Sequence, residues 1–128
     1  MSTAETGAWG ENTAVKFLEK NGYEIIARNF RARFGEIDII AWHAKPHFGK
    51  TLCFVEVKTR SGEKGSAERA TDWKKQKRIQ MTAKSYCQKY KIQIANTPIQ
   101  FEQVSVYIRG TFLQKPEITL YTVIPDGV

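Results

Sequence analysis

Two short segments in which charged and apolar residues alternate constrain the fold of this chain more than any other feature. In the first segment Glu36 and Asp38 alternate with isoleucines, and in the second Glu56 and Lys58 alternate with valines. Side chains two residues apart in a β-strand share one face of the sheet. The pattern therefore predicts two strands, each with its apolar residues together on a buried face and its charged residues together on the other.

Hydrophobic periodicity and turn residues extend this prediction to the whole chain. We expect the order helix, three strands, helix, two strands, which suits an α/β fold with a mixed sheet flanked by helices. Polar connections are expected at residues 44–50 and 61–66. The expected helices are Ala4–Lys20 and about Ala70–Tyr90, and the expected strands are Tyr23–Arg33, Glu36–His43, Thr51–Arg60, Ile99–Ile108 and Glu117–Ile124.

Length and composition indicate a single domain. The 128 residues, 41% of them hydrophobic, suffice for one compact unit, residues 1–128, with a sizeable core. The two cysteines are Cys53, in an expected strand, and Cys87, in an expected helix, so a disulfide framework is not expected. The first residues lack a basic and then apolar leader, and no apolar run approaches the roughly 20 residues that span a bilayer. We therefore expect a cytoplasmic protein without a membrane anchor.

The balance of charge favours a polyanionic partner. The formal net charge is +7 and the sequence pI is about 9.5, and nucleic acid is the commonest intracellular polyanion. Four cations fall within residues 74–78 of the second expected helix, and such a patch holds phosphates without reading sequence. The alternative is a solvated helix face with no partner. The residues expected to contact nucleic acid are Arg60, Lys74, Lys75, Gln76, Lys77 and Arg78.

The two alternating segments are expected to meet in one acidic site. A loop of about seven residues joins their strands, so an antiparallel hairpin should place Asp38 beside Glu56. Two carboxylates about 6 Å apart repel by roughly 3 kcal/mol at an effective dielectric near 20, and Lys58 relieves this only in part. A bound Mg²⁺ removes the repulsion because it prefers hard oxygen ligands. The alternative is an exposed ion pair of Glu56 and Lys58, worth well under about 1 kcal/mol.

Glu11 also calls for a partner, because it lies in the apolar stripe of the first helix, between Ala8 and Val15. An unpaired buried carboxylate costs several kcal/mol, so Glu11 should meet a cation, a metal or hydrogen-bond donors where the helix packs on the sheet. The alternative is a helix edge at which it reaches water. Gln76 poses the same question on the second helix, either as an amide bonded to backbone or as part of the site. The inward stripe expected there is Trp73, Gln80, Ala83, Cys87 and Tyr90.

Three motifs occur in a fixed order: GENTA at residues 10–14, GEIDII at 35–40 and FVEVKTR at 54–60. Together they resemble the YraN family, which is similar to the restriction-endonuclease-like, or PD-(D/E)XK, superfamily and most closely to archaeal Holliday-junction resolvases. The resemblance covers residues 7 to about 108. Ile37 stands where the superfamily's name has proline, and Glu102 stands where relatives usually carry aspartate. The role of Glu102, and with it the role of the fourth strand in the site, is left open.

The resemblance implies a restriction-endonuclease-like fold and a role for each motif residue. Glu11 takes the position of the helix carboxylate, Asp38 and Glu56 those of the two metal-binding carboxylates, and Lys58 that of the catalytic lysine. Glu11 is expected among the metal ligands as well. The backbone carbonyl of Val57 is implied as a further metal ligand. The implied cofactor is Mg²⁺ or Mn²⁺, and the implied activity is hydrolysis of phosphodiester bonds in DNA, including branched or structured DNA. Resolvase-like proteins act as dimers, so a homodimer is also implied.

Two other classes of function stay open at the level of the sequence. A nucleic-acid-binding module would keep the fold and bind without cleavage, so its binding would survive loss of the carboxylates. An adaptor in a larger nucleoprotein assembly would leave the acidic residues Asp38 and Glu56 without a role. Cleavage that depends on Lys58 would favour the nuclease over both.

Overall fold

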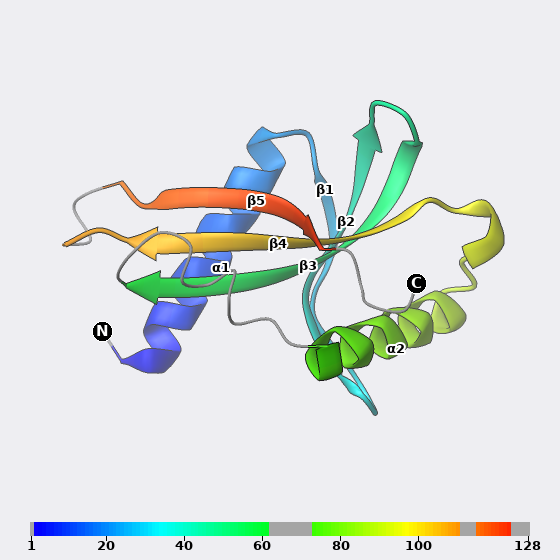
Figure 1. Ribbon diagram of the computed structural model, residues 1–128, viewed down its shortest axis with the longest axis horizontal. Helices are drawn as coiled ribbons and strands as arrows, with labels where there is room; N and C mark the ends of the chain where they lie inside the picture. Colours follow the sequence, from blue (N-terminus) through cyan, green and yellow to red (C-terminus); the bar gives the residue numbers. More distant parts are fainter. Residues whose placement is uncertain (1, 62–72, 111–114, 124–128) are drawn as a thin grey trace.

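The structure is a computed structural model, and it describes residues 2–61, 73–110 and 115–123. A five-stranded mixed sheet with the strand order β1-β2-β3-β4-β5 lies between two long helices (Figure 1). The predicted element order is confirmed, and it is consistent with an α/β restriction-endonuclease-like fold. The elements are α1 (Thr3–Lys20), β1 (Glu24–Ala32), β2 (Gly35–Lys45), β3 (Gly49–Ser61), α2 (Trp73–Lys89), the short 3-10 helix η2 (Ile94–Asn96), β4 (Ile99–Ile108) and β5 (Glu117–Val123).

The sheet is built from three antiparallel strand pairs and one parallel pair. β1 pairs with β2, β2 with β3 and β4 with β5 in antiparallel fashion, whereas β3 and β4 run parallel. A parallel pair needs a long crossover connection, which here carries α2. The predicted loop at 44–50 is shorter than expected, because the hairpin pairing continues to Lys45 and Gly49. The predicted connection at 61–66 lies outside the described residues beyond Ser61.

Local signals explain where α1 begins and ends. Ser2 is the N-cap: its hydroxyl accepts a hydrogen bond from the backbone N–H of Glu5, whose carboxylate bonds back to the backbone N–H of Ser2. At the other end Asn21 is the C-cap, and Gly22 takes a left-handed conformation with φ +86° that few other residues adopt easily. The predicted end of this helix at Lys20 is therefore confirmed.

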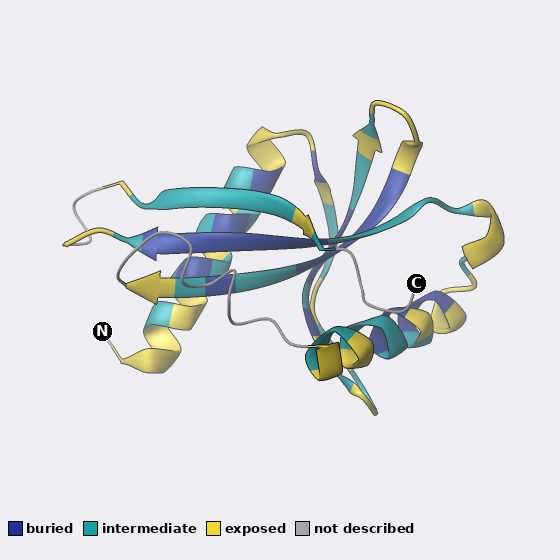
Figure 2. Ribbon diagram, viewed as in Figure 1, coloured by how far each residue is buried: buried dark blue, intermediate teal, exposed yellow. Residues whose placement is uncertain are grey.

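Two hydrophobic cores lie on opposite faces of the sheet, one under each helix (Figure 2). α1 approaches β3 so closely that a Cβ on Gly10 would lie 1.8 Å from the Thr59 hydroxyl. Glycine at this position therefore lets the helix rest directly on the strand. The buried residues of the α1-side core are Ala14, Leu18, Tyr23, Ile39, Ala41, Cys53, Val55, Val104 and Val106. Those of the α2-side core are Ile37, Ile40, Leu52, Phe54, Ala83, Tyr86 and Cys87.

The two cores correct the predicted pattern of β2. Ile37 and Ile39 were expected on one face, but Ile37 packs in the α2-side core and Ile39 in the α1-side core. The change falls at Asp38, where two irregularities coincide. Pairing with β3 ends at Ile39, and Asn29, which lies opposite Asp38 on β1, has a left-handed backbone with φ 53°. Asparagine tolerates this conformation better than most residues.

The stripe predicted for the second helix is only partly correct. Ala83 and Cys87 are buried, but Trp73, at the start of α2, is 57% exposed and Tyr90, just after its last residue, is 53% exposed. The two cysteines belong to different cores, so the expectation of no disulfide framework is confirmed. Neither α1 nor α2, nor any other helix in the described part of the chain, is long and apolar enough to cross a membrane.

Candidate functional site

Asp38 lies where β2 separates from β3. One of its carboxylate oxygens accepts a hydrogen bond of 2.8 Å from the backbone N–H of Val57, so the side chain continues the contact between the strands after their ladder has ended. Burial, opposed by this hydrogen bond and reinforced by the negative charges of Glu56, Glu11 and Glu36, raises the pKa of Asp38 to about 6. Asp38 is therefore a largely buried acid with other acids nearby, as the sequence predicts.

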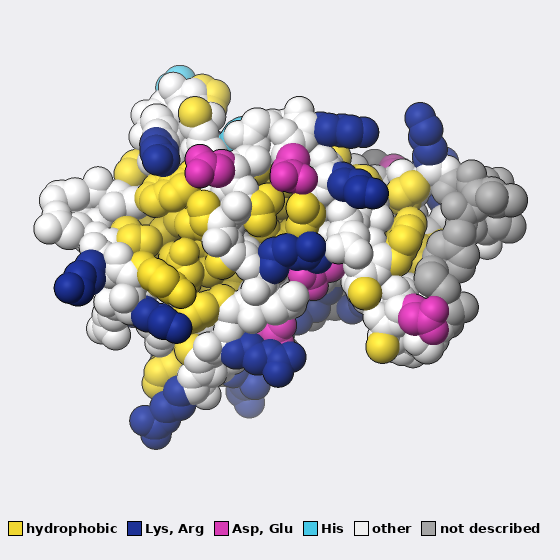
Figure 3. All heavy atoms as spheres, turned by 180° about the vertical axis from the view of Figure 1, so that it is seen from behind, with side chains coloured by type: hydrophobic (Ala, Val, Ile, Leu, Met, Phe, Trp, Pro, Cys, Tyr) yellow, Lys and Arg dark blue, Asp and Glu magenta, His cyan; other side chains and the backbone are white. Residues whose placement is uncertain are grey.

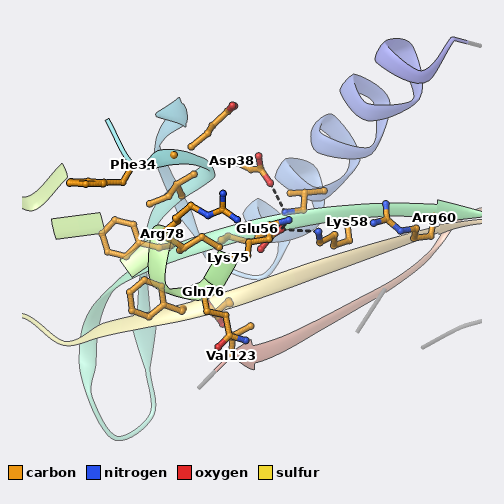
Figure 4. Close-up of a pocket in the computed structure, with 18 residues that line it drawn as sticks. Phe34, Asp38, Glu56, Lys58, Arg60, Lys75, Gln76, Arg78 and Val123 are labelled. Carbon is orange, nitrogen blue, oxygen red and sulfur yellow. Dashed lines mark hydrogen bonds and ion pairs between the residues drawn. The ribbon is translucent and has the colours of Figure 1, made fainter. Parts of the chain in front are cut away.

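A hollow of about 530 Å³ opens beside Asp38 on the α2 side of the sheet (Figure 4). Its wall combines strands β2, β3 and β4 with the first turns of α2. The structure brings the predicted residues Asp38, Glu56 and Lys58 together here. The charged and amide residues around this hollow are Glu36, Asp38, Glu56, Lys58, Arg60, Lys75, Gln76, Arg78 and Glu102.

Glu56 receives two ammonium groups. Lys58 contacts its Oε1 atom at 3.0 Å, and Lys75 from α2 contacts the same oxygen, as the two converging side chains in Figure 4 show. The predicted shared face of Glu56 and Lys58 is therefore confirmed, but the pair is buried rather than exposed, with side-chain exposures of 15% and 10%. Burial, together with the neighbouring Lys75, lowers the pKa of Lys58. Burial also acts to lower the pKa of Lys75, but the contacts with Glu56 and Lys58 outweigh it and raise that pKa.

Two buried polar residues of β4, Gln103 and Ser105, lie next to Glu56 and Lys58. In the parallel register of β3 and β4, Gln103 lies beside Glu56 and Ser105 beside Lys58. Both are fully buried, and the Gln103 amide donates a 3.1 Å hydrogen bond to the Ser105 hydroxyl. Sequence reasoning missed these residues, although they alternate with Val104 in the same way that the charges of β3 alternate with valines.

The position of Lys75 in the site was also missed, since this residue was predicted only as part of a basic surface. Helical spacing carries the signal: Lys75 lies four residues before Ile79 and eight before Ala83, both of which pack in the α2-side core. Gln76 also lines the hollow, and its Oε1 atom is buried without a hydrogen-bond partner among the described residues.

Glu11 lies on the other side of Asp38, where α1 crosses β1. Its carboxylate accepts hydrogen bonds from Arg28 at 3.2 Å and from the Asn29 amide at 3.0 Å. The expectation that Glu11 meets a cation and hydrogen-bond donors at the helix–sheet contact is confirmed. It does not line the first hollow but a second one of about 470 Å³, which shares Glu36, Asp38, Val57 and Arg60 with the first.

Glu102 is turned away from Glu56 and Lys58. Although it is among the residues around the first hollow, its carboxylate accepts hydrogen bonds from Tyr23 at 2.9 Å and 3.0 Å and from Lys45 at 3.0 Å, on the α1 side of the sheet. The fourth strand therefore contributes Gln103 and Ser105, rather than a carboxylate, to the surroundings of Glu56.

Comparison with known sequences places the chain in a family. The sequence pattern of the uncharacterised protein family UPF0102 matches residues 10–106, which include every motif of the site. The chain belongs to UPF0102. This confirms the resemblance to YraN drawn from the motifs.

Individual UPF0102 proteins match over most of their length. One from Caldicellulosiruptor bescii is 40% identical over 128 residues, covering 99% of this chain and 99% of that protein. One from Koribacter versatilis is 41% identical over 119 residues, covering 91% of this chain and 76% of that protein. A third, from Caldicellulosiruptor saccharolyticus, is 42% identical over 109 residues, covering 84% and 86% of the two chains. The family's description names no activity, so a function must be inferred from the residues of the site.

The donor atoms at this UPF0102 site fit a hard divalent cation, but they are partnered by the protein. Asp38 and Glu56 offer carboxylate oxygens, and the carbonyl of Val57 points to the same edge of β3 as the N–H that bonds to Asp38. Within residues 2–61, 73–110 and 115–123, no three His, Cys, Asp or Glu side chains are grouped closely enough to hold a metal. A cation here would rely on two carboxylates, the carbonyl and water, with Glu11 outside its immediate shell because Arg28 and Asn29 hold it.

Three of the five cations predicted to bind nucleic acid border the same hollow. Arg60, Lys75 and Arg78 line it, whereas Lys74 and Lys77 are exposed on α2. On the face shown in Figure 3, Lys and Arg side chains project from many parts of the surface and acidic ones form a few small groups.

Proposed function

We propose that this UPF0102 protein is a divalent-metal-dependent nuclease that hydrolyses phosphodiester bonds in DNA, including branched or structured DNA. The observation that carries the proposal is the hollow that holds Asp38, Glu56 and Lys58 under a rim of cations. Two acids and one buried lysine on adjacent strands are costly for stability and useful for chemistry on a phosphate.

Each residue of the site has a distinct part in this proposal. Asp38, Glu56 and the carbonyl of Val57 would hold Mg²⁺ or Mn²⁺, which supplies a Lewis acid and an activated water when bound. Lys58 holds its proton less tightly than a free lysine, because burial lowers its pKa. This suits a group that orients the attacking water and exchanges a proton with it.

The cationic rim would hold the substrate. Arg78 extends from α2 toward the hollow in Figure 4, and Arg60 lies at the far end of β3. Phosphate contacts of this kind position a strand without selecting its sequence. A cytoplasmic location and a homodimer stay predictions of the sequence and of the resemblance.

Cleavage assays test the proposal directly. Purified protein is incubated with junction, flap, single-stranded and duplex DNA in Mg²⁺ or Mn²⁺, beside Asp38→Asn, Lys58→Ala and, as a matched control, Lys84→Ala. Lys84 is exposed on α2 and lies outside both hollows. We expect wild type and Lys84→Ala to cleave at least one substrate and the two site variants to lose that activity. Cleavage that persists in Lys58→Ala would show contamination by another nuclease and count against the proposal.

A second function is favoured by one specific observation. Glu56 already has two ammonium partners, so its charge is balanced without a metal. This suits a binding module or adaptor that keeps the fold and does not cleave. Such a protein would bind DNA in a salt-sensitive way, and its affinity would be unchanged by Asp38→Asn and Glu56→Gln, whereas the nuclease should lose metal-stimulated binding in both.

A further inference from the structure

The Oε1 atom of Glu56 has an unusual environment, because two lysines from different elements share it. Lys58 reaches it along β3 and Lys75 reaches it from α2. Asp38 contributes to the field at Lys75 as well, so the ammonium group of Lys75 lies within the influence of both acids. The ammonium group of Lys75 therefore lies where the proposed function requires a divalent cation.

Lys58 and Lys75 differ in how easily each can separate from Glu56. The Lys58 side chain is 10% exposed and is fixed on a central strand, whereas the Lys75 side chain is 38% exposed and stands in the first turn of α2. A long side chain that is already partly in water can withdraw at small cost. Lys75 is therefore the more readily displaced of the two.

The net charge of the site decides whether Lys75 stays in contact with Glu56 or withdraws from it. Asp38 and Glu56 carry two negative charges when ionised, and Lys58 and Lys75 together match them. A divalent cation added to this set would leave two uncompensated positive charges in a partly buried site, which is unfavourable at a low effective dielectric. Withdrawal of Lys75 reduces that excess.

We propose that Lys75 is a displaceable stand-in for the divalent cation: it holds Glu56 in the cation-free protein and withdraws to the rim of the hollow when the cation binds. The inference rests on the proposed function, since it assumes that Asp38 and Glu56 are cation ligands. Once withdrawn, Lys75 stands among Arg60 and Arg78 and adds to the charge available for substrate phosphates. Cation and nucleic acid then strengthen each other's binding, because each favours the withdrawn lysine.

Calorimetric titration with Mn²⁺ and Mg²⁺ tests the competition. Wild type is compared with Lys75→Met, which keeps a similar length without charge, and with Lys84→Met as the control. Lys84→Met removes the same charge from the same helix, at a position about 13 Å from Lys75 along the helix axis. This separation exceeds the Debye length of about 8 Å at physiological salt. We expect Lys75→Met to bind Mn²⁺ about fivefold more tightly than wild type, and Lys84→Met to differ from wild type by less than about 1.5-fold. Circular dichroism confirms that all three proteins are folded.

The outcomes separate this inference from the proposed function. Equal affinities in the three proteins, or weaker binding by Lys75→Met, would overturn the displacement of Lys75 and leave the metal site in place. Failure of all three proteins to bind either cation would overturn the proposed metal site and the inference together.

Chemical labelling of lysines gives a readout independent of affinity. An acylating reagent is applied with and without saturating Mn²⁺, and modification at each lysine is measured by mass spectrometry. We expect labelling of Lys75 to rise at least about threefold with Mn²⁺, since the ion pair that protects it is released, and labelling of Lys84 to stay constant. Unchanged labelling of Lys75 at a saturating cation concentration would contradict its withdrawal.

Discussion

Two clusters of buried charge lie on opposite faces of the same sheet, and each pairs a glutamate with lysine. In the first, the closed cluster of Tyr23, Lys45 and Glu102, both carboxylate oxygens of Glu102 accept hydrogen bonds, and the Lys45 ammonium also donates to the Tyr23 hydroxyl at 2.7 Å. Glu102 is 3% exposed. Burial and the adjacent Glu102 charge raise the pKa of Tyr23 well above its usual value. Every group has a partner, so nothing is left to bind a ligand.

The open cluster of Asp38, Glu56, Lys58 and Lys75 has similar charges but a different geometry. It borders a hollow, two ammonium groups crowd one oxygen of Glu56, and among the described residues Asp38 accepts a single hydrogen bond, from Val57. Burial of charge is common to both clusters, so it does not by itself make the open cluster a candidate site. The open cluster is the better candidate because its charges are buried, incompletely paired and accessible to solvent.

The largest difference between the clusters should appear in cleavage. Glu56→Gln removes the charge of a proposed metal ligand while keeping its shape, and we expect cleavage to fall by at least about 100-fold. Glu102→Gln in the closed cluster should leave the rate per folded molecule within about threefold, because its carboxylate bonds to Tyr23 and Lys45. Rates are measured with folded fractions determined by circular dichroism. Equal losses would mean that the clusters do not differ in function.

For stability we expect the reverse: substitution in the closed cluster should destabilise the fold more than substitution in the open cluster. Lys45→Met leaves the buried Glu102 charge without its cation, and breaking such a pair destabilises a fold by about 3 kcal/mol. Lys75→Met leaves Glu56 paired with Lys58, and Lys75 is more than a third exposed, so we expect a loss of less than about 1 kcal/mol. Urea unfolding measures both changes. A larger loss for Lys75→Met would mean that the open cluster is structural.

The pH dependence of stability should isolate Asp38. Its pKa of about 6 in the folded protein exceeds the ordinary value of 3.8, so between these values the native state binds more protons than the unfolded state. The free energy of unfolding therefore falls as pH rises through this window. Asp38→Asn lacks this loss. Its free energy of unfolding should therefore increase relative to that of wild type by about 2 kcal/mol between about pH 4 and about pH 7. Urea titrations in EDTA measure the difference, and a constant offset across the window would refute the raised pKa.

Much of the open cluster was predictable, because its key residues obey local rules. Alternation in β3 placed Glu56 and Lys58 on one face, and the short hairpin connection placed Asp38 close to them. The position of Glu11 within an apolar stripe predicted a partner, which the structure supplies as Arg28. These inferences need only the period of a strand or helix and the length of one loop.

The parts that were missed depend on contacts between distant segments. The pairing of Lys75 with Glu56 requires the position of α2 over the sheet, and the closed cluster joins residues 79 positions apart, Tyr23 and Glu102. The separation of Ile37 and Ile39 between two cores arises where β2 parts from β3, which periodicity does not reveal. Sequence patterns thus predicted which strand residues share the site, but not which of them are already neutralised.

The smallest expected effect distinguishes the surfaces around the two clusters. Arg78 lines the open hollow, whereas Lys20 is exposed at the end of α1, three residues before Tyr23 of the closed cluster. If DNA lies over the open cluster, Arg78→Ala should lower the slope of log affinity against log salt by about one and weaken binding about threefold, because one phosphate contact releases about one counterion. Lys20→Ala removes the same charge and should leave the slope unchanged. Fluorescence anisotropy at four or more salt concentrations measures both slopes. Equal changes would mean that the protein attracts DNA through its net charge of +7 rather than through the hollow.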